Sequence, residues 1–189
     1  MEKLFDHYWN MVGEGQDTSL IRKNKHFDEL NVYLQNHVDS IAILEDKVPC
    51  KYRDWKKWDM HFPDKKVAIE YKTITAKSIQ KCKYLRVEEA LGSSLDVKAN
   101  DADYKLGFFV LFAFNLNNER IPISVYKWRD WIVSTFGDMV QDGHYDFLCI
   151  IQTNGIGSHE VIGEYGLDQF VEGINNVEGG HQSSLERFL

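Results

Sequence analysis

Asp59, Glu70 and Lys72 place two carboxylates and an ammonium group within a short stretch of the sequence, and such groups can bind a metal ion and assist catalysis. They lie in the stretch KWDMHFPDKKVAIEYKT, where two runs of alternating polarity flank a Pro-Asp-Lys-Lys turn. This pattern predicts a β-hairpin of strands 57–62 and 67–73 joined by a four-residue loop. Because successive side chains of a strand point to opposite faces, the hairpin decides which of the three charges come together.

The register of this hairpin brings the two carboxylates together. If Phe62 faces Val67 across the loop, antiparallel pairing places Asp59 opposite Glu70, with Cβ atoms about 4.5–5.5 Å apart. Lys72, two residues beyond Glu70, emerges on the same face. Directly opposed like charges destabilise a sheet, and a divalent cation between them removes the conflict.

The chemistry that this patch predicts is metal-assisted hydrolysis of a phosphodiester. Mg²⁺ prefers hard oxygen ligands and needs only one or two carboxylates, which leaves positions for water and a substrate phosphate. A nearby ammonium group orients the attacking water and offsets developing charge. Asp59 and Glu70 are therefore the predicted metal ligands and, with Lys72, the predicted catalytic set. Two alternatives stay open: Asp64 in the loop replaces Asp59 as ligand, or the charges belong to a solvated surface hairpin.

Length and composition predict one compact domain over residues 1–189, because 43% hydrophobic content suffices for one core. The sequence has no apolar run of about 18 residues and begins without a basic and apolar leader, so we expect no membrane contact. Three cysteines without C-x-x-C spacing favour reduced thiols, and hence a cytoplasmic protein.

The charge is unevenly distributed along the chain. The formal net charge is −7, yet 12 Lys and Arg stand against 4 acids between Lys47 and Arg86. The rest of the chain holds 10 basic and 25 acidic residues. A basic block around the predicted catalytic residues favours nucleic acid as the partner, and an ordinary solvated charge run is the alternative.

The elements around the hairpin predict an α/β fold with a mixed β-sheet flanked by helices. A helix followed by the apolar strand LGFFVLFAF is typical of an α/β crossover. In chain order we expect helices at 3–12 and up to about 38, an irregular strand at 40–48, the hairpin, a helix at 86–100, a strand at 106–114, a helix at 123–136, a strand at 146–152 and a helix at 167–174. The catalytic core covers about 40–152, after N-terminal helices 3–38, and a loose tail covers about 178–189.

Between the hairpin and the next helix lies TITAKSIQKCKYLR, residues 73–86, which contains no acid. Its Lys77, Lys81, Lys83 and Arg86 are the predicted DNA contacts, since lysine and arginine neutralise backbone phosphates, and an ordinary exposed loop is the alternative.

Several of these residues resemble a known family. The spacing D-x10-E-x-K resembles the PD-(D/E)xK nuclease core, and Trp58-Asp59, Glu70-x-Lys72 and R-x-E-E-A-x-G-x-x-x-D over residues 86–96 resemble the XhoI-type type II restriction endonucleases. A fainter similarity lies in HYDFLC, residues 144–149. The likeness covers residues 55–114, about a third of the chain.

The resemblance implies a restriction-endonuclease-like core and a dimeric, Mg²⁺-dependent endonuclease that cuts double-stranded DNA at a short palindromic site. It implies Glu88 and Glu89 as accessory acids, a homodimer, and a cognate DNA methyltransferase as a further partner. The acid-free lysine segment departs from the family, so the CTCGAG target of the family does not carry over. A structure-specific or repair nuclease on the same fold, and a non-catalytic DNA-binding protein, are the alternatives.

Overall fold

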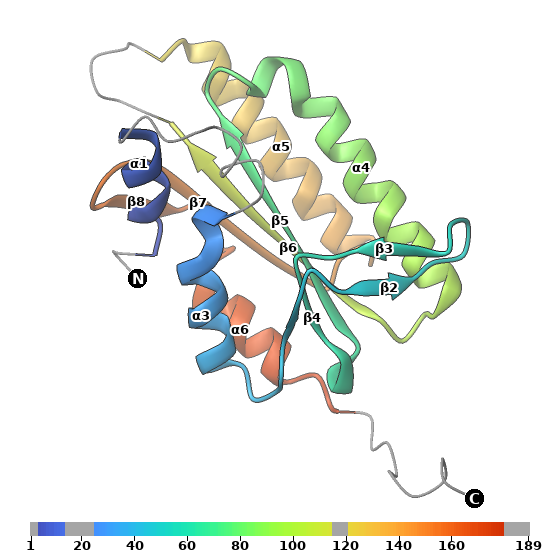
Figure 1. Cartoon of the computed structure of the whole chain (residues 1–189). Helices are drawn as coiled ribbons and strands as arrows, with labels where there is room; N and C mark the ends of the chain where they lie inside the picture. The colour runs from blue at the N-terminus through green and yellow to red at the C-terminus, as the bar shows by residue number, and fades with distance from the viewer. Residues whose placement is uncertain (1–3, 14–24, 115–120, 180–189) are drawn as a thin grey trace, which may run out of the picture.

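A computed structural model describes residues 4–13, 25–114 and 121–179. Its centre is a mixed six-stranded sheet in the order β1-β4-β5-β6-β7-β8, and β2 and β3 form a separate two-stranded sheet (Figure 1). The strands are β1 Ile43–Leu44, β2 Lys47–Pro49, β3 Trp55–Lys57, β4 Met60–Phe62, β5 Val67–Thr75, β6 Lys105–Ala113, β7 Phe147–Gly155 and β8 Ser158–Val161. The helices are α1 Asp6–Gly13, α3 Asp28–His37, α4 Ile79–Asn100, α5 Ile123–Gln141 and α6 Leu167–Asn175, with short 3-10 helices η1 Lys25–Phe27 and η2 Pro63–Lys65. None of the described helices is long and apolar enough to cross a membrane.

Strand β6 lies inside the sheet because its sequence, KLGFFVLFA, is apolar on both faces. It runs parallel to β5 on one side and to β7 on the other. Helices α4 and α5 connect these three strands in sequence. The predicted buried strand 106–114, the strand at 146–152 and the α/β crossover are therefore confirmed.

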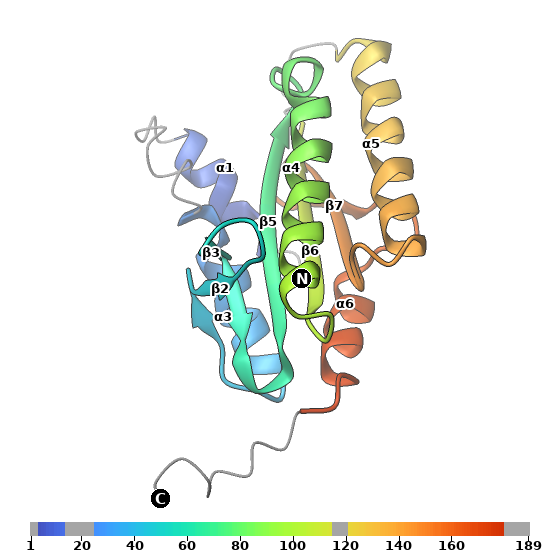
Figure 2. The same ribbon diagram turned by 90° about the vertical axis from the view of Figure 1, so that its right-hand side faces the viewer.

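Helices cover both faces of the sheet, as Figures 1 and 2 show from two directions. Phe108 and Val110 of β6 belong to a core shared with α4 and α5. Phe109 and Leu111 belong to a second core shared with α1, α3 and α6. The alternation of side chains along β6 thus separates two apolar layers, and the predicted mixed sheet flanked by helices is confirmed.

The register predicted for the hairpin is confirmed in its paired part. Phe62 pairs with Val67 and Met60 with Ile69 in antiparallel β4 and β5. The loop is η2, closed by Lys66 in the left-handed conformation at φ 50°. The first arm is shorter than predicted, because β4 starts at Met60.

Two other predicted elements are wrong in extent. The irregular strand at 40–48 is divided between β1 of the large sheet and β2 of the small one. The helix predicted at 86–100 begins earlier, because β5 continues to Thr75 and α4 starts at Ile79, and the alternative of an exposed loop over 73–86 is therefore wrong. Strand β8 was not predicted, and much of the predicted second helix lies outside the described residues.

Candidate active site

Glu70 and Lys72 lie on the face of β5 that is turned to α4. Ala68 and Ile74, which share their parity along the strand, belong to the core beneath α4 and α5. Tyr71 belongs to the opposite core. Period-two alternation therefore directs a carboxylate and an ammonium group into a layer that is otherwise apolar. Glu70 is only 6% exposed.

The Glu70 carboxylate lies between two lysines. Lys72 Nζ is 2.6 Å from Oε1 of Glu70, and Lys56 Nζ, from β3, is 2.5 Å from Oε2. Burial raises the pKa of Glu70, but the two ammonium groups outweigh burial and hold this pKa below its usual value. Glu70 is therefore ionised at neutral pH.

These side chains line a pocket of about 350 Å³ between β5, α4 and the segment that leads into β3. It is lined by Arg53, Lys56, Glu70, Lys72, Glu88, Glu89, Gly92 and Ser93. Acidic and basic groups thus converge on one opening, with the acids of α4 facing the charges of β5. We name it the Glu70 pocket.

The predicted accessory acids lie in the Glu70 pocket. Glu89 pairs with Arg86 one turn earlier on α4, at 2.6 Å. Glu88 is exposed on the same helix. Within the described ranges, no three or more His, Cys, Asp and Glu side chains are grouped closely enough to hold a metal ion. Mg²⁺ needs only one or two carboxylates beside water and substrate oxygens, so Glu70 with one acid of α4 fits it by donor type.

Asp59 is not among the residues that line the Glu70 pocket. Strand pairing stops at Met60, one residue short of the predicted Asp59–Glu70 pair. The Asp59 carboxylate instead accepts a hydrogen bond of 2.7 Å from the backbone N–H of Tyr71. Asp59 therefore lies beside the backbone of β5 next to Glu70, and its role as ligand stays a prediction.

Asp64, the alternative ligand, lies at the other end of the hairpin. It is part of η2 and accepts a hydrogen bond from the Ser40 hydroxyl. It lines a different cavity from Glu70.

Arg53 and Lys56 were not predicted as site residues. Asp96 of α4 holds the segment that carries them, because its carboxylate accepts from Tyr52 N at 2.7 Å and from Arg53 Nε at 2.5 Å. Burial raises the pKa of Asp96, but these hydrogen bonds and the Arg53 charge leave it below its usual value. The basic and aromatic run KYRDWKK was the available sequence signal.

The four predicted DNA contacts are in three different environments. Lys77 and Lys81 are exposed at the start of α4. Lys83 is buried, and its ammonium group lies 3.8 Å from the centre of the Trp128 ring on α5. Arg86 is paired with Glu89. Lys83 is thus held inside the α4–α5 contact, where it stabilises packing by a cation–π interaction.

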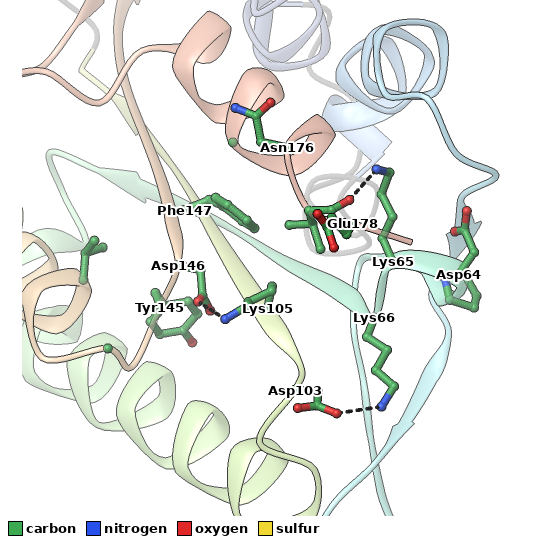
Figure 3. Close-up of a pocket in the computed structure, with 15 residues that line it drawn as sticks. Asp64, Lys65, Lys66, Asp103, Lys105, Tyr145, Asp146, Phe147, Asn176 and Glu178 are labelled. Carbon is green, nitrogen blue, oxygen red and sulfur yellow. Dashed lines mark hydrogen bonds and ion pairs between the residues drawn. The ribbon is translucent and has the colours of Figure 1, made fainter. Parts of the chain in front are cut away.

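A larger cavity than the Glu70 pocket, about 1110 Å³, lies elsewhere among the described residues, at the amino ends of β6 and β7 (Figure 3). Its lysines have partners: Lys65 Nζ donates to the Val177 carbonyl, Lys66 pairs with Asp103, and Lys105 pairs with Asp146. A third cavity, about 440 Å³, is lined by Lys77 and by Trp9 and Trp128.

Comparisons of the chain with protein-family models, with curated proteins and with solved structures give no match.

Proposed function

We propose that this chain is a Mg²⁺-dependent endonuclease that hydrolyses double-stranded DNA in the Glu70 pocket, on a PD-(D/E)xK core. The observation that carries the proposal is the ionised and nearly buried Glu70, held at 2.6 Å from Lys72 at the floor of an opening that Glu88 and Glu89 share. A buried charge is costly to maintain, and perturbed carboxylates in clefts cluster at functional sites.

The metal would be held by Glu70, with Glu88 or Glu89 as the second acid and Asp59 as the ligand expected from the family pattern. A bound Mg²⁺ ion supplies a lowered pKa for its water and a positive charge beside the phosphoryl oxygens. Lys56 now holds Oε2 of Glu70, so its ammonium group has to move for that oxygen to become a ligand. Its long stem permits such a movement, since lysine has four rotatable bonds.

Lys72 has two tasks in this proposal. Its ammonium group keeps Glu70 ionised, and it lies within the same pocket as the phosphate that would be cleaved. There it orients the attacking water and offsets the charge that develops on the phosphoryl oxygens.

The partner in this proposal is duplex DNA, and the basic block between Lys47 and Arg86 is the feature that attracts it. Exposed Lys77, just before α4, and exposed Lys81, in its first turn, extend the positive charge beyond the residues that line the Glu70 pocket. Cutting a palindromic site would require a homodimer, because a two-fold site is matched by two copies of one chain. A cognate methyltransferase would protect the host site.

A non-catalytic DNA-binding protein is the second candidate. The observation that favours it is the complete pairing of Glu70, whose two oxygens each lie within 2.6 Å of an ammonium group. In that case the ion pairs are structural and the basic groups bind phosphates.

Incubation of the protein with supercoiled plasmid tests both candidates. With Mg²⁺, a restriction endonuclease gives discrete bands, and a structure-specific nuclease cuts only at junctions or cruciforms. With Ca²⁺, both retain DNA without cutting it. Retention of DNA under both metals without any cleavage contradicts the nuclease and supports the second candidate.

A further inference from the structure

Helices α4, α5 and α6 each contain one glycine in their interior, and packing accounts for two of these three. A Cβ atom at Gly137 of α5 would come within 2.5 Å of Tyr165 Oη, and one at Gly173 of α6 within 2.7 Å of Phe147 Cδ1. At Gly92 of α4, an added Cβ would meet nothing within 4 Å. Neighbouring side chains therefore do not require glycine at position 92.

The backbone does not require it either. Gly92 lies eight residues before the end of α4 and has no positive φ. Apart from proline, glycine is the least favourable residue in a helix interior, because it loses the most conformational freedom on folding. Alanine at this exposed position would stabilise the helix, so the stability of the fold does not explain the glycine.

The position of Gly92 beside the Glu70 pocket explains why a residue without a side chain is found there. Gly92 lines the Glu70 pocket together with Glu70 and Lys72. Glu88, one turn before Gly92 on the same face of α4, is an accessory acid candidate. Ser93, the residue after Gly92, lines the pocket as well. A side chain at position 92 would project into the space above Glu70 and Lys72 instead of into the protein.

We propose that the bare helix surface at Gly92 receives the sugar-phosphate backbone of the DNA strand that is cleaved. Three cations of the pocket, Arg53, Lys56 and Lys72, suit the phosphates on either side of one sugar. The missing side chain lets the deoxyribose lie against the backbone of α4, as glycine does wherever a ligand approaches a main chain closely. This inference rests on the proposed nuclease function and assigns a binding role to Gly92.

The inference predicts that Gly92→Ala stabilises the fold but weakens the binding and cleavage of DNA. Gly92→Ala should raise the melting temperature by about 2 °C, because alanine favours the helix. The same change should weaken binding of a duplex in Ca²⁺ and lower its cleavage in Mg²⁺ by roughly tenfold, since even one methyl group occupies the space of the sugar. Gly92→Leu should abolish both.

Ala99→Leu is the matched control. Position 99 is exposed on the same side of α4, two turns towards its end, and does not line the Glu70 pocket. It should leave binding and cleavage unchanged. Gly92→Ala with wild-type binding and cleavage overturns the inference while leaving the nuclease intact, and a lowered melting temperature overturns it by showing that packing needs the glycine. Wild-type protein that neither binds nor cuts DNA overturns the proposed function and the inference with it.

Discussion

In the proposed metal site, Lys56 occupies the position beside Glu70 that the metal ion would take. Its ammonium group lies 2.5 Å from Oε2 of Glu70, which is the atom that a cation would need. Lys56→Gln removes the competing charge and should strengthen Mn²⁺ binding by about tenfold, or ~1.4 kcal/mol. Titration calorimetry measures this affinity directly.

Lys57→Gln is the control for that measurement, because Lys57 is the next residue and pairs with exposed Glu45, away from the pocket. It should leave Mn²⁺ binding unchanged. Equal affinity in Lys56→Gln and wild type would show that Lys56 does not occupy the position of the metal.

His26 provides a second test at this scale, and it concerns stability. Burial, with the nearby charge of His7, lowers the pKa of His26 to about 4, and its ring bonds to the Thr73 hydroxyl at 2.6 Å. The unfolded chain takes up this proton near the ordinary pKa of about 6.5, so folding stability falls as the pH drops from 6.5 to 4. The expected loss is about 3 kcal/mol, on the order of 1.36 kcal/mol per pKa unit.

His26→Gln keeps a hydrogen-bonding group towards Thr73 but does not titrate. Its unfolding free energy, measured with urea at pH 7 and pH 4.5, should therefore change less than that of the wild type. His37→Gln, at an exposed position, should retain the wild-type dependence. A His26→Gln profile that parallels the wild type would contradict the assignment.

At the scale of elements, the proposed function distinguishes exposed lysines near the start of α4, which we expect to contact DNA, from a buried lysine that holds the fold. Lys81 is exposed, whereas Lys83 is buried against Trp128. Lys81→Gln should flatten the slope of log K against log salt by about 0.9, the value for one phosphate contact. Lys83→Met should leave the slope unchanged and lower the melting temperature.

These slopes come from fluorescence anisotropy of a labelled duplex at several salt concentrations. A slope that changes in Lys83→Met and not in Lys81→Gln would reverse the assignment of the two lysines.

The sequence pattern predicted some of these elements well. The alternation in VAIEYKT was enough to place Glu70 and Lys72 on one face, and the turn residues after Phe62 were enough to set the register of β4 and β5. The break in the first arm could not be predicted. The chain changes from the small sheet to the large one at Trp58 and Asp59, while the alternation of polarity continues across the change.

The start of α4 escaped prediction for a different reason. Its buried side includes Lys83, so the apolar periodicity of a helix is interrupted there by a charge. Ser78 stands at the N-cap position, but its hydroxyl bonds to Thr75 instead of capping the helix. Lys56 was missed as a site residue because β3 belongs to another sheet, and only the folded chain brings it to Glu70.

At the scale of the whole molecule, the fold brings many of the basic residues close to the Glu70 pocket. Most of the basic residues from Lys47 to Arg86 lie on β2, β3, β5, the start of α4 and the segments that join them, whereas Lys65 and Lys66 lie at the other end of the hairpin, and the Glu70 pocket opens between β5 and α4. Figure 2 shows the β2–β3 sheet beside α4, next to β5. The rest of the chain, with 10 basic and 25 acidic residues, disfavours indiscriminate coating of DNA, so the proposed function predicts that DNA binds on the basic side of the protein.

The central claim is that the Glu70 pocket hydrolyses DNA, and the rate of duplex cleavage by Glu70→Gln tests it most directly. Gln keeps the size of the side chain and removes the charge that binds a metal, so cleavage in Mg²⁺ should fall to background while a circular dichroism melt shows a folded protein. Glu45→Gln, which changes an exposed acid outside the pocket, should cut at the wild-type rate. Wild-type cleavage by a folded Glu70→Gln variant would contradict the claim.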